Sequence, residues 1–205
     1  EKEDSLNQQA RDEFKKLEDG NPQSKELWDI FRELSLKEFN RIYDILGMTF
    51  DSYDGEASIN KQVQPAIEEI KEKVKTEMSD GALIVDLEEY NMPPMLLLKS
   101  DGATTYHSRD MATAFKRLRK LRAQKLLYIV GSEQKLQFKQ LFKVLEMMGY
   151  PKENFIHADF GLIRFPEGKM STRKGRVIFL EDLLTKAIQT IEKIIEEKNP
   201  NLKNK

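Results

Sequence analysis

A short cationic segment near the end of the chain has the composition of a phosphate-binding loop. Glycines stand at both ends of segment 168–175, and four cations lie in it or directly after it: Lys169, Arg173, Lys174 and Arg176. Flexible backbone N–H groups, hydroxyls and mobile positive charge together suit the oxygens of a phosphate chain. The other interpretation is a solvated basic turn, which is the commoner role for a cluster of this size.

The segments around this loop predict alternating strands and helices. Apolar runs predict strands over 95–98, 125–131, 155–165 and 177–179. Helical periodicity predicts helices between and after them, over 108–121, 133–148 and 181–198. Such alternation implies right-handed crossovers and a parallel sheet, whose ligands bind outside the carboxyl ends of the strands. Upstream, helices are predicted over 1–19, 24–46 and 64–78, with a strand over 82–87.

Polar residues follow the strands at this edge of the predicted sheet. Tyr106 is expected to end a strand and Asp110 to lie in the first helical turn, with Ser108 as the N-cap. Ser24 is the cap expected for the helix over 24–46. The helix dipole favours an acid at a position such as that of Asp110 whatever its function. Gln134 follows the next strand, so its position predicts proximity to Tyr106 and Asp110.

Composition excludes several classes of protein. Hydrophobic residues make up 39% and charged residues 34%, with a net charge of −1, so any contact with a polyanion must use a local patch. The basic helix over 108–122 could form one, although a solvated face is the default. The chain has no cysteine and two histidines, and we predict no protein-bound metal site. No membrane-spanning run or signal pattern occurs, which predicts a cytoplasmic protein with no membrane partner.

The residues of the basic loop carry a resemblance to a known family. Lys169-Met170-Ser171 resembles the second signature of class I aminoacyl-tRNA synthetases, and the flanking segments 159–163 and 177–183 resemble bacterial arginyl-tRNA synthetases. Segments 101–110, 130–134 and 140–142 are similar to that family in the same order and spacing. The resemblance covers roughly residues 35–202, and four motifs in order make it specific.

The resemblance implies an α/β fold: the second half of the Rossmann-like parallel sheet of class I synthetases, with a mainly helical insertion. On this basis residues 1–90 are the helical and insertion region of a catalytic domain. Residues 91–198 are the C-terminal half of that Rossmann-like domain, and residues 199–205 are a polar tail.

The resemblance also implies a role for each site residue. Tyr106, Asp110 and Gln134 match the family residues that bind the guanidinium of arginine. A carboxylate suits a planar cation that is always charged, and phenol and amide oxygens accept its remaining N–H groups. Lys169 and Ser171 are the implied catalytic residues that contact the ATP phosphates, while Met170 packs beside the adenine. Thr172 departs from the signature, which often has a second lysine there.

The implied reaction is ATP-dependent activation of L-arginine to arginyl-adenylate, followed by transfer to the 3′ end of arginine tRNA. Mg²⁺ is expected as part of the ATP substrate complex. The chain has no His-x-Gly-His-type signature, so we expect a piece of a longer ligase, without its N-terminal and anticodon-binding portions and inactive alone. Two alternatives remain. One is a non-catalytic arginine- or RNA-binding module derived from a synthetase, and the other is a phosphate- or RNA-binding domain of unrelated activity.

Overall fold

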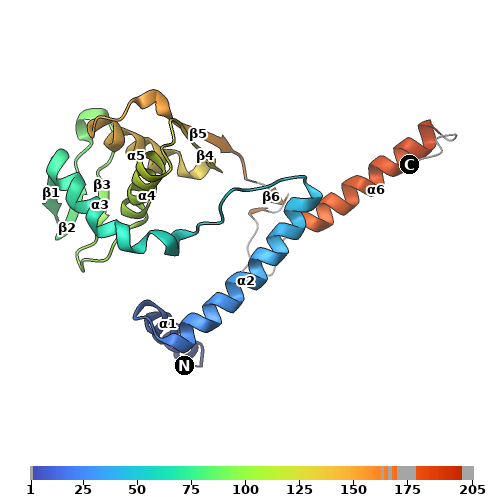
Figure 1. Ribbon diagram of the computed structural model, residues 1–205, viewed down its shortest axis with the longest axis horizontal. Helices are drawn as coiled ribbons and strands as arrows, with labels where there is room; N and C mark the ends of the chain where they lie inside the picture. Colours follow the sequence, from blue (N-terminus) through green and yellow to red (C-terminus); the bar gives the residue numbers. More distant parts are fainter. Residues whose placement is uncertain (1, 163, 166–167, 170–178, 200–205) are drawn as a thin grey trace. The chain divides into compact units, whose positions relative to one another are not determined.

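The computed structural model describes residues 2–162, 164–165, 168–169 and 179–199 (Figure 1). The chain divides into two compact units, one made of residues 1–51 with 171–205 and the other of residues 52–170. Among the described residues, the buried hydrophobic side chains run from Ile59 to Phe155 and so all belong to the second unit. No helix in the described ranges is long and apolar enough to cross a membrane.

The described part of the first unit consists of long helices that leave most of their large apolar residues exposed. Its helices are α1 (Lys2–Glu18), α2 (Pro22–Ile45) and α6 (Leu180–Lys198). Neither α2 nor α6 has a buried residue. Arg41 of α2 donates two hydrogen bonds to the Glu181 carboxylate of α6, at 2.7 and 2.6 Å. These helices match the predicted segments closely.

The cap of α2 differs from the prediction. Asn21 Oδ1 accepts the backbone N–H groups of Gln23 at 3.0 Å and Ser24 at 3.1 Å, so Asn21 is the N-cap and the predicted cap at Ser24 is wrong. Pro22 explains the difference. Proline fits the first helical position, where no N–H is needed, and this places the cap immediately before it.

The second unit contains the sheets and the helices that cover them. Its helices are α3 (Asn60–Lys73), α4 (Tyr106–Phe115) and α5 (Lys135–Met147). Its strands are β1 (Thr76–Ser79), β2 (Ala82–Val85), β3 (Met95–Leu98), β4 (Leu126–Gly131), β5 (Phe155–Phe160), β6 (Arg164–Phe165) and β7 (Gly168–Lys169). Short 3-10 turns are η1 (Glu56–Ile59), η2 (Glu88–Tyr90), η4 (Ser132–Gln134) and η5 (Lys152–Asn154), and η3 (Lys116–Lys120) is a π turn.

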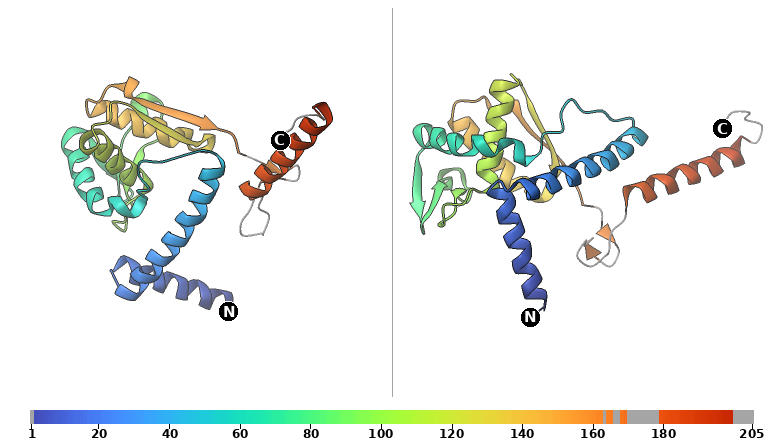
Figure 2. Two further views of the ribbon diagram at one scale, coloured as in Figure 1. Left: turned by 45° about the vertical axis from the view of Figure 1, so that its right-hand side comes forward. Right: turned by 60° about the horizontal axis from the view of Figure 1, so that its bottom comes forward.

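Strands β4 and β5 confirm the predicted parallel sheet with a helical crossover. They pair in parallel from Leu126 opposite Phe155 to Gly131 opposite Phe160, and α5 connects them. Figures 1 and 2 both show the two strands side by side. The predicted strand 155–165 ends earlier than expected, at Phe160, and the predicted strand residues 177 and 178 lie outside the described part of the chain.

The first predicted strand of the parallel sheet belongs instead to an antiparallel sheet. Its strands follow the order β1-β2-β3, and β3 pairs antiparallel with β2.

The predicted helix 64–78 is wrong at its end, because α3 stops at Lys73 and β1 follows. Asp80 and Gly81 have φ values of 49° and 78° and form the two-residue turn that joins β1 to β2. The division of the chain at residue 90 stays a prediction, although β2 and β3 pair across it.

Helix α4 occupies the centre of the second unit. It packs against α3, β3 and α5, and α5 in turn packs against β5. Met111 of α4 and Leu141 and Leu145 of α5 are fully buried in the resulting core. Burial alternates along β4, where Leu126 and Tyr128 are buried while Leu127 and Ile129 are exposed. This arrangement places α4 next to α5, so the first turns of the two helices can contact each other.

Candidate functional site at the start of helices α4 and α5

Helix α4 begins with a capping box that sets the position of the predicted site residues. Thr105 Oγ1 accepts the N–H of Ser108 at 3.4 Å, and Ser108 Oγ accepts the N–H of Thr105 at 3.0 Å. Thr105 Oγ1 also lies 2.6 Å from the carbonyl oxygen of Leu96, to which it donates. Thr105 is therefore the cap, and the prediction of Ser108 as cap is wrong. Tyr106 opens the helix and does not end a strand.

Asp110 lies one turn after Tyr106 and contacts helix α5. A separation of four residues places both side chains on one face of α4. The Tyr106 residue is 60% exposed, whereas Asp110 is half-buried. Gln137 Nε2, from the first turn of α5, donates a hydrogen bond to Asp110 Oδ2 at 2.5 Å. The structure thus brings an acid of α4 to the beginning of α5.

The surroundings of Asp110 disfavour its negative charge. Burial raises the pKa of the Asp110 carboxyl, and the Glu56 carboxylate raises it further. The hydrogen bond from Gln137 and the positive charge of Arg117 lower this pKa. The Arg117 guanidinium lies 5.3 Å from the centre of the Tyr128 ring. A cation placed beside Asp110 would therefore stabilise the ionised carboxylate.

Gln134 lies close in sequence to this contact but does not join it directly. It is the exposed last residue of η4, immediately before α5. The side chains of Tyr106, Asp110 and Gln134 make no hydrogen bonds with one another within the described residues. The sequence drew attention to Gln137 only for an ATP role that it left in doubt, and its contact with Asp110 was not predicted. Its spacing of three residues from Gln134, close to one helical turn, was the available signal.

The predicted phosphate-binding residues are described only in part. The backbone of Lys169 belongs to β7 and pairs with Arg164 of β6 in an antiparallel ladder. Met170 and Ser171 lie outside the described residues, as does the rest of the loop to residue 178. The roles of Lys169, Met170 and Ser171 therefore stay predictions.

Cations of the basic helix are engaged by acids of the same unit. Lys116 Nζ lies 2.6 Å from Asp54, and Arg119 donates two hydrogen bonds to Glu69, at 2.6 and 2.7 Å. Arg109 Nη1 lies 3.5 Å from the Glu56 carboxylate. These pairs neutralise part of the surface charge, which favours the interpretation of this helix as a solvated face.

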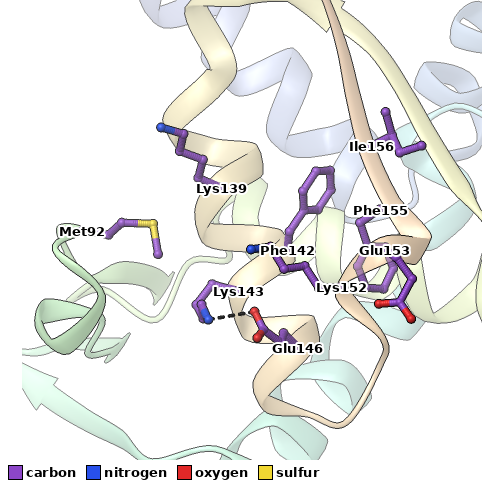
Figure 3. Close-up of a pocket in the computed structure, with 9 residues that line it drawn as sticks. All are labelled: Met92, Lys139, Phe142, Lys143, Glu146, Lys152, Glu153, Phe155 and Ile156. Atoms are coloured by element: carbon purple, nitrogen blue, oxygen red, sulfur yellow. Dashed lines mark ion pairs between the residues drawn. The ribbon is translucent and has the colours of Figure 1, made fainter.

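A depression separate from the Asp110 contact lies beside the first residues of β5 (Figure 3). It has a volume of about 680 Å³, with Phe142 and Phe155 in its wall. Lys143 and Glu146 form an ion pair of 2.7 Å there. The depression adjoins the amino end of β5, whereas Asp110 contacts the first turn of the helix that follows the carboxyl end of β4. None of the predicted site residues lines it. Nowhere in the described ranges do three or more His, Asp or Glu residues form a group that could hold a metal ion.

Solved arginyl-tRNA synthetases share this arrangement of strands and helices. The structure of the Plasmodium falciparum arginyl-tRNA synthetase matches with a TM-score of 0.72 at 23% identity, covering 95% of this chain and 35% of that one. The Thermus thermophilus synthetase matches with a TM-score of 0.65 at 19% identity, covering 92% and 40%. The chain therefore has the α/β fold of class I synthetases of this kind, as predicted.

Sequence similarity identifies the family. The model for tRNA synthetases class I (R), catalytic domain, matches residues 1–205, and the chain belongs to this family. It is 49% identical over its whole length to the arginine–tRNA ligase of Halothermothrix orenii and 48% identical to that of Clostridium botulinum strain Okra. The chain spans 36% and 37% of the lengths of these two curated relatives.

Proposed function

We propose that the protein carrying this chain is an arginine–tRNA ligase and that this chain supplies its arginine-reading residues. The observation that supports the proposal most is similarity over the whole chain to arginine–tRNA ligases. The half-buried Asp110 carboxylate, held at one oxygen by Gln137, adds a group suited to a guanidinium. The proposed substrates are L-arginine, ATP with Mg²⁺, and arginine tRNA, and the proposed location is the cytoplasm.

The proposed reaction has two steps, neither of which needs a protein nucleophile. A carboxylate oxygen of arginine attacks the α-phosphorus of ATP, and the bond to the β-phosphate oxygen breaks, releasing pyrophosphate. A hydroxyl of the 3′-terminal ribose of tRNA then attacks the carbonyl carbon of arginyl-adenylate, and AMP leaves with the bonding electrons. Catalysis then depends on positioning and on stabilisation of charge.

Each site residue has one role in this proposal. Ionised Asp110 pairs with the guanidinium of arginine, and the oxygens of Tyr106 and Gln134 accept its remaining N–H groups. Lys169 and Ser171 stabilise negative charge on the departing pyrophosphate, and Met170 packs beside the adenine. The chain carries no His-x-Gly-His-type signature, and we therefore assign the complete reaction to the full-length protein and not to this chain alone.

Titration with arginine and with citrulline, its neutral isostere, tests the proposal. The full-length protein should bind arginine and reject citrulline, and it should attach arginine to tRNA. Asp110→Asn should weaken arginine binding by about 3–5 kcal/mol, because it removes one partner of a desolvated ion pair. Asp182→Asn makes the same chemical change at an exposed position of α6 and should leave binding unchanged. Equal binding of arginine and citrulline would contradict the assignment of a guanidinium-reading carboxylate.

Further measurements on the full-length protein distinguish between the alternatives that the sequence left open. Arginine binding without arginine-dependent exchange between ATP and pyrophosphate would indicate a non-catalytic module. RNA binding that depends on Lys169, with no effect of Asp110→Asn, would indicate an unrelated phosphate-binding domain.

A further inference from the structure

The hydrogen bond between Gln137 and Asp110 distinguishes the two oxygens of the carboxylate. Gln137 Nε2 donates to Oδ2 at 2.5 Å, and both side chains are half-buried. Oδ1 accepts no hydrogen bond from the described residues. A carboxylate that reads a guanidinium needs an oxygen available to its N–H groups, and Oδ1 meets this requirement.

We propose that Gln137 is a positioning residue that orients the Asp110 carboxylate so that Oδ1 faces the guanidinium of arginine. The inference rests on the proposed function of Asp110. The terminal torsion of aspartate is broad, so the carboxylate of an isolated side chain samples many orientations. A hydrogen bond from the neighbouring helix removes this freedom before the substrate binds, and a pre-oriented group loses less entropy on binding.

Gln137 also favours the ionised form of Asp110 that must bind the cation. Among the described residues, the charged or titratable side chains of other elements that interact electrostatically with Asp110 are Glu56 of η1, Arg117 of η3 and Tyr128 of β4. Burial and Glu56 raise the pKa of Asp110, while Gln137 and Arg117 lower it. Without the Gln137 donor, Arg117 remains as the group that favours ionisation. The pKa of Asp110 should then rise. As pH falls, arginine binding should therefore be lost at a higher pH than in the wild type.

Arginine kinetics as a function of pH test the inference in the full-length protein. Gln137→Met keeps the length of the side chain but removes the donor. We expect kcat/KM for arginine to fall by about 10- to 100-fold at neutral pH, the range for a lost hydrogen bond to a charged group. The change should lie mainly in KM, and the acidic limb of the profile should move to higher pH. Lys139→Met, an exposed position on the same helix, is the matched control and should change neither.

A double-variant cycle separates positioning from simple packing. In the Asp110→Asn background, Gln137→Met should cause little further loss, because the group that it orients no longer carries charge. An equal loss in both backgrounds, or a wild-type KM and pH profile for Gln137→Met, would overturn the inference. If Gln137→Met does not fold, Gln137→Asn replaces it, since the shorter amide stays polar but is withdrawn from Asp110. A wild-type KM for Asp110→Asn would instead reject the proposed function of Asp110.

Discussion

Asp110, the proposed arginine-binding acid, lies in surroundings that disfavour its own negative charge. A half-buried carboxylate loses hydration, and a single hydrogen bond from Gln137 replaces that hydration only in part. The Glu56 carboxylate adds repulsion from a neighbouring element. A bound guanidinium would supply the missing positive charge. The same desolvation that disfavours the negative charge of Asp110 in the free protein would therefore strengthen the interaction of this charge with arginine.

Asp110→Asn should not destabilise the free protein at neutral pH. Because the folded pKa of Asp110 is raised, the folded state holds this proton to a higher pH than the unfolded state. The carboxyl therefore lowers the unfolding free energy as pH rises through its ordinary pKa toward the folded value. Asparagine does not titrate and still offers Gln137 an acceptor oxygen. Urea unfolding at acidic and neutral pH should show the variant gaining stability relative to wild type as pH rises. The opposite trend would contradict this account.

The surroundings of Glu69 favour its negative charge, in contrast to those of Asp110, so Glu69 should contribute to stability. Hydrogen bonds from Arg119 are the main cause that lowers the pKa of Glu69 to about 2, with a further contribution from Lys73. Its contribution is present above the ordinary carboxyl pKa and is lost as pH falls toward about 2. Glu69→Gln should lower the unfolding free energy at neutral pH by about 1 kcal/mol, a value reduced by partial exposure.

Glu68→Gln is a matched control for this prediction. Glu68 neighbours Glu69 on α3 and pairs with Lys71 on an exposed surface, and no long-range partner contacts it within the described ranges. Its substitution should leave the denaturant midpoint unchanged. Equal midpoints for both variants would show that the Arg119 contact adds no stability.

The capping box of α4 links helix stability to the site. Thr105 is 6% exposed, and its hydroxyl bonds both the Ser108 N–H and the Leu96 carbonyl. Thr105→Ala should lower the unfolding free energy by about 1–2 kcal/mol, as for other lost N-caps. It should also weaken arginine binding, because Tyr106 and Asp110 occupy the first turns of this helix. Thr105→Ser keeps the hydroxyl and should retain most of the stability and affinity. A Thr105→Ala variant with wild-type stability would contradict the capping role.

Local stability should differ between the two compact units. The buried hydrophobic residues of the described chain lie between Ile59 and Phe155, whereas α2 and α6 have none. Packing supplies most of the stability of a protein helix, so unpacked helices open readily. Hydrogen exchange on the isolated chain should be slowest in α4 and α5 and much faster in α2 and α6. Equal protection in all four helices would contradict this prediction.

Periodicity predicted the strongly patterned elements well. Strand β4, helix α5 and helix α6 form close to the expected residues, because the period of the apolar residues in each one fits a single backbone geometry. The parallel pairing of β4 with β5 followed from the crossover rule. Caps were less predictable. Ser24 and Ser108 are both good cap residues, but neither caps its helix. Asn21 caps α2 because Pro22 fits the first helical position, and Thr105, which also bonds the Leu96 carbonyl, caps α4.

Sequence by itself determined the family, the parallel β4–β5 unit and the residue types available for a guanidinium and a phosphate chain. It determined these because motif spacing and hydrophobic period are local properties of the chain. Tertiary structure decided that β3 joins an antiparallel sheet and that Gln137 meets Asp110. Both depend on contacts between segments separated along the chain, and strand partners and facing helix surfaces are selected by the packing of the whole unit. The polarity of Gln137 was visible in the sequence, but its partner was not.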